Sequence, residues 1–191
     1  MKDISFVFKI VVIGDGQVGK TTLIQRFTRK TFKEDYIKTI GADLSNYDYE
    51  INKDKIRLQF WDIAGQDKFH FLRPSFFNKS RAAIIVYSLE DNKLGQESFK
   101  NIPNWFGEIK KYCGDIPVVL FANKVDLINE NDIKSSVLDE LVKENDFLGY
   151  RITSAKTGQG VIDAFNMIIN ELYYKFKKLS EESKSFDYLN N

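Results

Sequence analysis

Hydrophobic positions along the chain fall into continuous, alternating and helical runs, and each kind predicts a different element. Continuous apolar runs of strand length are typical of strands buried on both faces. They occupy residues 6–13, 82–87 and 117–122, and a shorter strand is predicted at 150–153. Residues 44–51 and 56–61 alternate with a period of two around a polar turn, which predicts a β-hairpin.

Apolar residues three and four apart predict the helices between these strands. The helical ranges are 22–30, 96–112, 132–143 and 161–176. Pro74 allows a further helix only from about its own position onward, and Pro103 is expected to bend or restart the 96–112 helix. Strands that alternate with helices predict an α/β fold with a six-stranded, mostly parallel sheet and about five helices. The 44–51 strand is expected to be antiparallel at one edge.

Length and composition are those of one soluble domain. The chain has 191 residues and a formal net charge of +1, so its bulk charge indicates no nucleic-acid partner. We expect a monomeric domain over residues 1–179, followed by a flexible polar tail at 180–191. Cys113 is the single cysteine, so no disulfide forms within the chain. The absence of a signal peptide and of a membrane-length apolar run favours a cytoplasmic protein.

The first chemical motif follows the strand at 6–13 and precedes a helix. It has the pattern of a phosphate-binding P-loop, whose backbone N–H groups surround phosphate oxygens at a helix N-terminus. The residues assigned to it are Gly14, Asp15, Gly16, Gln17, Val18, Gly19, Lys20, Thr21 and Thr22. Lys20 is expected to reach the β- and γ-phosphates, and the Thr21 hydroxyl to bind Mg²⁺. The alternative is a glycine-rich turn that binds no ligand.

Two further motifs at strand ends point to guanine as the base. Asp126, in the string Asn-Lys-Val-Asp after the strand at 117–122, can accept two hydrogen bonds that guanine offers and adenine does not. Asn123 is expected to bridge to the P-loop or the base, and the stem of Lys124 to pack on the ring. The last strand ends in Ser154, Ala155 and Lys156, where the Ala155 N–H is a candidate donor to guanine O6. Either string alone also occurs in ordinary turns.

A third strand end carries groups for metal binding and hydrolysis. Asp62 follows the strand at 56–61 and is placed to hold Mg²⁺ directly or through water. Gly65 offers a backbone N–H, and Gln66 is a candidate for orienting an attacking water.

Taken together, these motifs make the chain resemble a small GTPase of the Ras superfamily, most of all the Rab branch, over residues 6–176. The strings that carry the resemblance are Tyr-Ile-Lys-Thr-Ile-Gly-Ala-Asp at 36–43 and Trp-Asp-Ile-Ala-Gly-Gln at 61–66. The resemblance implies a P-loop NTPase three-layer sandwich. It also implies that Thr39 is a second Mg²⁺ ligand that senses the γ-phosphate, that Phe32 packs edge-on against guanine, and that Tyr36 is a further nucleotide-binding residue.

The implied function is a GTP-hydrolysing molecular switch that alternates between GTP- and GDP-bound states in membrane trafficking or cytoplasmic signalling. The catalytic residues are then Lys20, Thr39, Gly65 and Gln66, with Mg²⁺ held by Thr21, Thr39 and Asp62. Effectors, exchange factors and activating proteins are expected to bind switch I, about residues 32–44, and switch II, about residues 65–78. No arginine is assigned to the phosphates, so slow intrinsic hydrolysis is expected.

The chain departs from the Rab pattern at several positions. Leu44 replaces a phenylalanine of the aromatic triad that faces effectors, and Ile63 replaces a threonine. The printed sequence has no C-terminal cysteine for prenylation, so no lipid anchor is expected and any membrane association is peripheral or depends on a partner. His70 is assigned to solvent or to an effector contact.

Two other functions remain open from the sequence. An ATP-using P-loop enzyme is disfavoured by Asp126 and is distinguished by comparing GTP with ATP binding. A nucleotide-bound interaction module that does not hydrolyse GTP is disfavoured by Thr39, Asp62 and Gln66, and a single-turnover assay distinguishes it.

Overall fold

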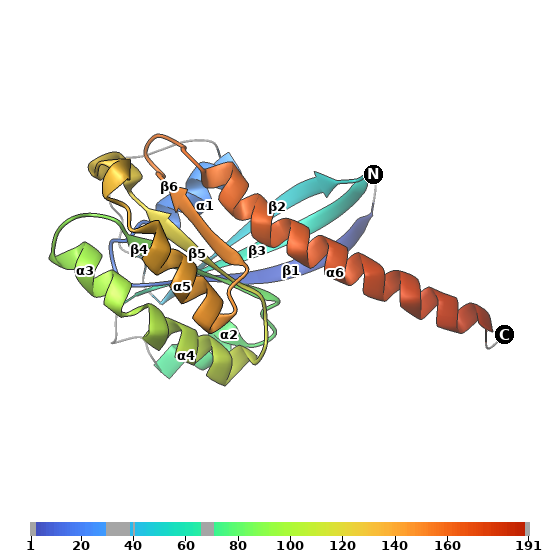
Figure 1. Ribbon diagram of the computed structural model, residues 1–191. Coiled ribbons are helices and arrows are strands. Elements are labelled where there is room, and N and C mark those ends of the chain that lie inside the picture. The colour runs from blue at the N-terminus through green and yellow to red at the C-terminus, as the bar shows by residue number, and fades with distance from the viewer. Residues whose placement is uncertain (1–2, 30–38, 40, 66–70, 190–191) are drawn as a thin grey trace.

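The computed structural model describes residues 3–29, 39, 41–65 and 71–189, with side chains described as far as Ser183. Its centre is a six-stranded sheet in the order β2-β3-β1-β4-β5-β6 (Figure 1). The strands are β1 (Ile4–Ile13), β2 (Ala42–Ile51), β3 (Asp54–Ile63), β4 (Ala82–Ser88), β5 (Val118–Asn123) and β6 (Gly149–Thr153). Only the β2–β3 pair is antiparallel among these strands, which confirms the predicted fold class with its antiparallel edge strand.

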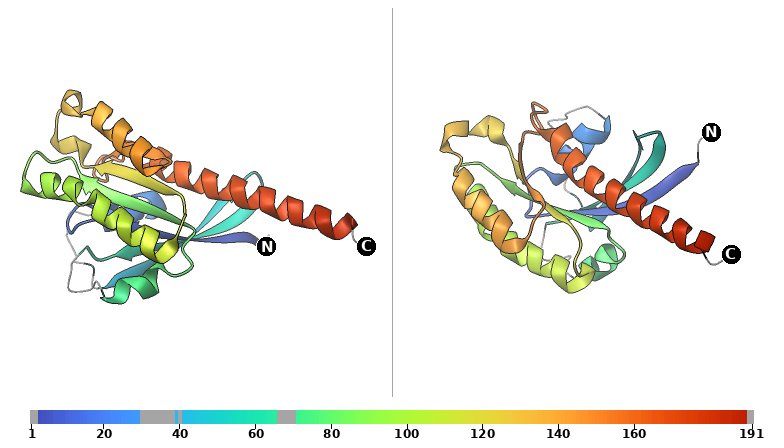
Figure 2. Two further views of the ribbon diagram at one scale, coloured as in Figure 1. Left: turned by 60° about the horizontal axis from the view of Figure 1, so that its bottom comes forward. Right: turned by 45° about the vertical axis from the view of Figure 1, so that its right-hand side comes forward.

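Helices cover both faces of the sheet and form a three-layer sandwich (Figure 2). They are α1 (Lys20–Arg29), α2 (Arg73–Phe77), α3 (Lys93–Lys100), α4 (Ile102–Cys113), α5 (Ser135–Asn145) and α6 (Val161–Leu189). Successive strand residues point to opposite faces, so Ile10 joins the core under α1 and α6 while Val11 joins the core under α4 and α5. The alternation in the sequence therefore sets which helices each strand residue meets.

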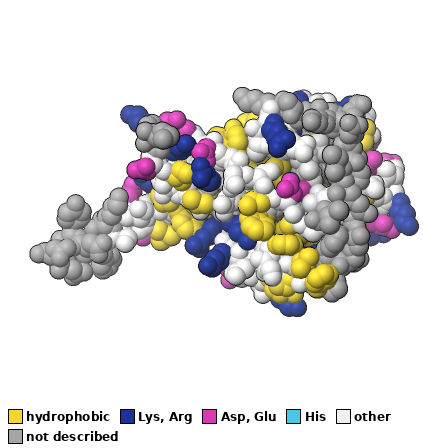
Figure 3. Space-filling view, turned by 180° about the vertical axis from the view of Figure 1, so that it is seen from behind, with side chains coloured by type: hydrophobic (Ala, Val, Ile, Leu, Met, Phe, Trp, Pro, Cys, Tyr) yellow, Lys and Arg dark blue, Asp and Glu magenta, His cyan; other side chains and the backbone are white. Residues whose placement is uncertain are grey.

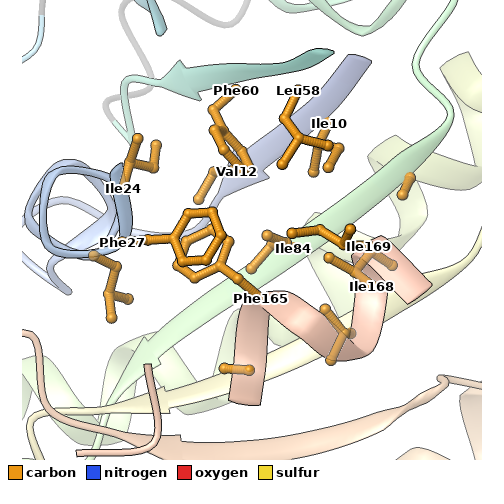
Figure 4. Close-up of a cluster of buried hydrophobic side chains, with 14 of the residues drawn as sticks. Ile10, Val12, Ile24, Phe27, Leu58, Phe60, Ile84, Phe165, Ile168 and Ile169 are labelled. Atoms are coloured by element: carbon orange, nitrogen blue, oxygen red, sulfur yellow. The ribbon is translucent and has the colours of Figure 1, made fainter. Parts of the chain in front are cut away.

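Aromatic packing holds α1, the helix that follows the P-loop, against α6. The Phe27 and Phe165 rings stack with centroids 4.4 Å apart, and Phe60 of β3 meets Phe165 edge-on at 5.2 Å (Figure 4). All three side chains are buried. Burial of one such side chain contributes roughly 1.5–3 kcal/mol, so this cluster fixes the helix that carries Lys20 and Thr21.

The predicted helix at 96–112 is divided in two at Asn101. The Asn92 side chain caps α3 by accepting a hydrogen bond from the Gly95 N–H at 3.1 Å. Pro103 lies in the first turn of α4, where its missing N–H removes no helical hydrogen bond. The proline thus restarts the helix, as the sequence predicted.

The C-terminal helix is longer than its apolar face predicted, because α6 continues from Val161 to Leu189 and extends past the sheet (Figure 1). No glycine or proline interrupts residues 161–189, and Lys178 lies 3.9 Å from Glu182 one turn on. Most of the expected tail is thus helical, and its flexibility stays a prediction. Within the described residues, no helix combines the length and the hydrophobicity that crossing a membrane requires.

Candidate nucleotide-binding site

The P-loop lies between β1 and α1, at the carboxyl ends of the parallel strands. Gly19 adopts a φ of +100°, and a Cβ there would lie 2.3 Å from Asn123 Nδ2. Gly65, just after β3, packs even more closely, because a Cβ on it would lie 2.4 Å from the Gly14 carbonyl oxygen and from the Asp15 carbonyl carbon. Both positions therefore require glycine, and β3 and β5 both end against the P-loop.

Lys20 is buried inside the loop that its sequence motif defines. Its Nζ donates hydrogen bonds to the carbonyl oxygens of Gly14 at 2.7 Å and Asp15 at 2.6 Å. Burial lowers the pKa of Lys20 to about 8, and the charges of Asp62 and Asp15 partly oppose that shift. A desolvated ammonium with carbonyl acceptors is well placed to gain from a phosphate oxygen.

Three oxygen-bearing side chains meet beside Lys20. The Thr21 hydroxyl donates to Asp62 Oδ2, the Thr39 hydroxyl lies 3.1 Å from the same oxygen, and the two hydroxyls are 3.0 Å apart. Asp62 is 3% exposed, and burial raises the pKa of its carboxyl against the opposing effects of Thr21 and Lys20. Thr21 is on α1, Thr39 precedes β2, and Asp62 is on β3, so three elements build this cluster.

The cluster fits a magnesium ion. Asp62 Oδ1 is buried and has no hydrogen-bond partner in the described part of the chain, which leaves one carboxylate oxygen without compensation. Mg²⁺ takes oxygen ligands and keeps several waters or phosphate oxygens, so one carboxylate and two hydroxyls suffice on the protein side. Residues 3–29, 39, 41–65 and 71–189 contain no group of three or more His, Cys, Asp or Glu suited to a metal.

Asn123 joins the P-loop to the end of the sheet. Its Nδ2 donates to the Val18 carbonyl at 2.9 Å, while its Oδ1 accepts from the Thr153 hydroxyl and the Ala155 N–H, both at 3.2 Å. The side chain is 1% exposed, so these hydrogen bonds are made away from water. The expected bridge to the P-loop is present. The Ala155 N–H assigned to guanine O6 already has an acceptor, so its contact with the base stays a prediction.

The other proposed base-contacting residues lie around the same strand ends. Asp126 is exposed and accepts a hydrogen bond from the Ser154 hydroxyl at 2.5 Å, which orients its carboxylate. Lys124 has a φ of +71° and pairs with Glu90 at 2.5 Å. Burial opposes ionisation of Glu90, but hydrogen bonds from Lys124 and Ser88 outweigh it and lower the pKa of that carboxyl. Lys156 is exposed at the rim.

Comparison with known proteins agrees with this geometry. The sequence model of the Ras family matches residues 9–174. Ras-related protein Rab-30 of Homo sapiens is 34% identical over 203 residues, which covers 99% of this chain and 96% of that protein. Ras-related protein Rab-19 of Mus musculus is 31% identical over 172 residues, which covers 90% of this chain and 77% of that protein.

The chain belongs to the Ras family. It is a Rab-like small GTPase of the Ras superfamily, it binds guanine nucleotides, and it hydrolyses GTP. In open α/β sheets ligands bind at the carboxyl ends of the strands, which is where the P-loop and the strand ends described above lie.

Some site residues predicted for this Rab-like GTPase fall outside the described residues. They are Phe32, Tyr36 and Gln66, and His70, assigned to solvent or to an effector contact, lies outside them too. Of the other P-loop residues, Gly16 has open space where a Cβ would lie, and Gln17 is exposed with a φ of +66°. Thr22 follows Thr21 in the first turn of α1. The structure therefore brings together the described residues that were predicted to bind phosphate and magnesium and to read the base, and their roles stay predictions.

Several supporting residues of the GTPase site were missed in the sequence. Glu90 pairs with Lys124, and Asn101 and Trp105 both donate to the Asp15 carboxylate, at 2.7 and 2.8 Å. Asn101 and Trp105 are four residues apart, a spacing that predicts a shared helix face but names no partner. Their contact with Asp15 spans 86 and 90 residues of sequence, so no local pattern could reveal it.

The structure describes part of the surface that is predicted to face effectors in this Rab-like protein. Leu44 is 43% exposed and lies opposite Trp61 in the β2–β3 pairing. The Trp61 ring lies 5.9 Å from that of Phe76 and is covered by Lys9 Nζ at 4.1 Å. Seen from behind the view of Figure 1, hydrophobic side chains lie beside Lys and Arg side chains (Figure 3). Leucine thus takes the place of the aromatic residue next to an aromatic pair, Trp61 and Phe76, and the basic Lys9.

Proposed function

We propose that this GTPase is a molecular switch in which the γ-phosphate of GTP, together with Mg²⁺, holds Thr39 and Gly65 in place. The observation that supports this most is the meeting of Thr21, Thr39 and Asp62. Thr39 is 18 residues from Thr21, yet its hydroxyl lies 3.0 Å from the Thr21 hydroxyl. A residue of the predicted switch I thereby contacts the groups that would hold the metal.

The roles of the individual residues follow from their positions. The P-loop amides and Lys20 bind the β- and γ-phosphates, and Thr21, Thr39 and Asp62 hold Mg²⁺, which neutralises phosphate charge when bound. Asp126 accepts hydrogen bonds from guanine, and Ser154 orients its carboxylate through a hydrogen bond. Gln66 orients the attacking water, and GTP loses its γ-phosphate in the reaction. Thr39 and Gly65 then lose their phosphate contacts, and switch I and switch II relax.

The cellular role that we propose is Rab-like signalling in the cytoplasm or in membrane trafficking, by a monomer. Effectors, exchange factors and activating proteins bind switch I at 32–44 and switch II at 65–78. The exposed Leu44 and the aromatic residues near it support a protein-binding role for this surface.

Nucleotide dissociation tests the switch directly. We expect Thr39→Ala to speed release of a fluorescent GTP analogue several-fold in Mg²⁺ while leaving GDP release nearly unchanged, because the hydroxyl acts only when the γ-phosphate is present. Thr28→Ala is the matched control, since Thr28 Oγ1 donates to the Ile24 carbonyl within α1. Equal effects of Thr39→Ala on both nucleotides would contradict the proposal. A parent protein that binds GTP but fails to hydrolyse it in a single turnover would favour the non-hydrolysing module.

A further inference from the structure

The side chain of Lys124, in the string Asn-Lys-Val-Asp, has a fixed direction. Its Nζ lies 2.5 Å from Glu90 Oε2, and only 23% of the lysine side chain and 19% of the glutamate side chain are exposed. The backbone of Lys124 is left-handed, with a φ of +71°, and leads into the short 3₁₀ helix Val125–Leu127. A residue with a Cβ keeps this conformation only where its surroundings impose it, and such positions are concentrated at functional sites. Neighbouring residues therefore set both the backbone turn and the ammonium of Lys124.

Glu90 is itself held in place by the loop between β4 and α3. The Ser88 hydroxyl donates to Glu90 Oε2 at 2.8 Å, and Asn92 Nδ2 donates to Oε1 at 3.4 Å. The first turn of α3 packs against the backbone of this loop, because a Cβ on Gly95 would lie 1.9 Å from the Glu90 carbonyl oxygen. Asn92 also caps α3. The carboxylate that receives Lys124 is thus carried by a loop anchored on a strand and a helix.

The ion pair between Glu90 and Lys124 lies at the strand ends that form the nucleotide site. β4 and β5 are parallel neighbours, and the Leu89 N–H donates to the Asn123 carbonyl at 2.8 Å. The Asn123 side chain holds the P-loop, and Asp126 is the carboxylate predicted to read guanine. The ion pair therefore lies between a P-loop contact and a predicted base contact.

Stability alone is a weak explanation for this ion pair. Removing two charges from water costs free energy that their attraction seldom exceeds, so a largely buried pair adds little stability. Burial opposes ionisation of Glu90, yet the hydrogen bonds from Lys124 and Ser88 lower the pKa of its carboxyl, so the pair is charged. What the pair fixes is geometry, because a lysine whose flexible stem can point in many directions is directed at one oxygen.

We propose that Glu90 is a positioning residue for guanine-nucleotide binding, which holds the Lys124 ammonium so that the stem of Lys124 lies along the purine ring. A stem that is already directed loses less conformational freedom when the base arrives, so the base is bound more tightly. The methylenes of the lysine supply apolar contact while its charge stays on Glu90. This role rests on the proposed function, in which the base is bound beside Asp126.

The test compares the affinities of the full chain for GDP and for inosine diphosphate, with Mg²⁺ present. The two nucleotides share the purine ring and the phosphates, but inosine diphosphate lacks the exocyclic amine that Asp126 is proposed to bind. We expect Glu90→Gln to weaken both affinities about tenfold and to leave their ratio within about twofold of the parent value, because the lysine stem contacts the ring and not the amine. Glu97→Gln is the matched control and should change neither affinity, since Glu97 pairs with Lys93 at 3.6 Å on the exposed surface of α3.

A double-mutant cycle shows whether Glu90 acts through Lys124. In a Lys124→Met background, which lacks the ammonium, Glu90→Gln should change GDP affinity less than about twofold. An effect as large as in the parent background would overturn the proposal. An altered ratio of the two affinities in Glu90→Gln would mean that the variant displaces Asp126, and would overturn it too. A purely structural role would lower the melting temperature and leave both affinities at the parent value, with the same consequence.

Ser88→Ala keeps the proposal testable if Glu90→Gln does not fold. It removes the hydroxyl that orients the Glu90 carboxylate, so both affinities should fall about threefold with their ratio unchanged, and unchanged affinities would then overturn the proposal. A parent protein that binds GDP no more tightly than inosine diphosphate would overturn the proposed base site, and the role of Glu90 with it. A failure confined to the variants overturns the role of Glu90 alone.

Discussion

Nucleotide binding by this GTPase is predicted to take up a proton near pH 8, because of Lys20. Burial lowers the pKa of Lys20 from 10.5 to about 8. At 1.36 kcal/mol per pKa unit, keeping the ammonium charged in the folded state costs roughly 3 kcal/mol. A phosphate beside Lys20 raises the pKa of the lysine back toward 10.5. The protein with Lys20 protonated is therefore the form that binds nucleotide.

The sign of the pH dependence follows from this depressed pKa. Between pH 8 and 10.5 the unfolded chain holds the Lys20 proton and the folded protein has lost it. Stability of the nucleotide-free protein should therefore rise with pH across this window, by roughly 3 kcal/mol from this group. Over the same window GDP affinity should fall about tenfold per pH unit, since each binding event must first protonate Lys20.

Isothermal titration calorimetry of GDP binding measures this proton directly. Titrations at pH 8 in two buffers of different ionisation enthalpy should show uptake of about half a proton, and Lys143→Met, which removes an exposed lysine on α5, should give the same value. The terminal phosphate of GDP is already ionised at this pH, with a second pKa of about 6, so it adds little. Binding with no proton uptake at pH 8 would refute the reasoning.

Three further predictions concern single residues. Asp126→Asn should shift nucleotide preference from guanine toward xanthine in competition binding, because an amide can donate where the carboxylate accepts; unchanged GTP affinity would count against this role. Asn123→Ala should lower the free energy of unfolding in urea by about 2–4 kcal/mol, because the buried Val18 carbonyl and Ala155 N–H lose their hydrogen-bond partner. The control Asn129→Ala, at an exposed turn, should lower it by less than about 1 kcal/mol. The intrinsic hydrolysis rate should be about 10⁻⁴–10⁻³ s⁻¹, the order given for Ras, and Gln66→Leu should lower it without weakening GTP binding. An unaltered rate would mean that another group holds the attacking water.

Much of the fold was predictable because its elements are encoded locally. The buried strands and the β2–β3 hairpin follow from runs and alternation, and Pro103 marks the division between α3 and α4. The predicted end of the last helix was wrong, since the apolar face stops near Phe176 while the polar residues after it still favour helix to Leu189. Helix propensity without an apolar face gives only a weak signal in the sequence.

The site residues that belong to a known sequence motif could be predicted. The supporting residues that are distant in sequence could not. Thr21, Thr39 and Asp62 meet as the family resemblance implied. The contacts of Asn101 and Trp105 with Asp15 join a helix to a loop, and the two approach each other only in the folded chain.

The central claim is that this GTPase is a switch. Its most direct test is a comparison of hydrogen exchange between the GDP form and the form bound to a non-hydrolysable GTP analogue. The account predicts stronger protection in the GTP form over residues 31–39 and 65–72, with little change in α2 or in α1. The sequence alone extended the second segment to residue 78, but the burial of Arg73 and Phe77 shortens it. Equal protection of both segments in the two forms would contradict the account and leave a static guanine-nucleotide-binding protein.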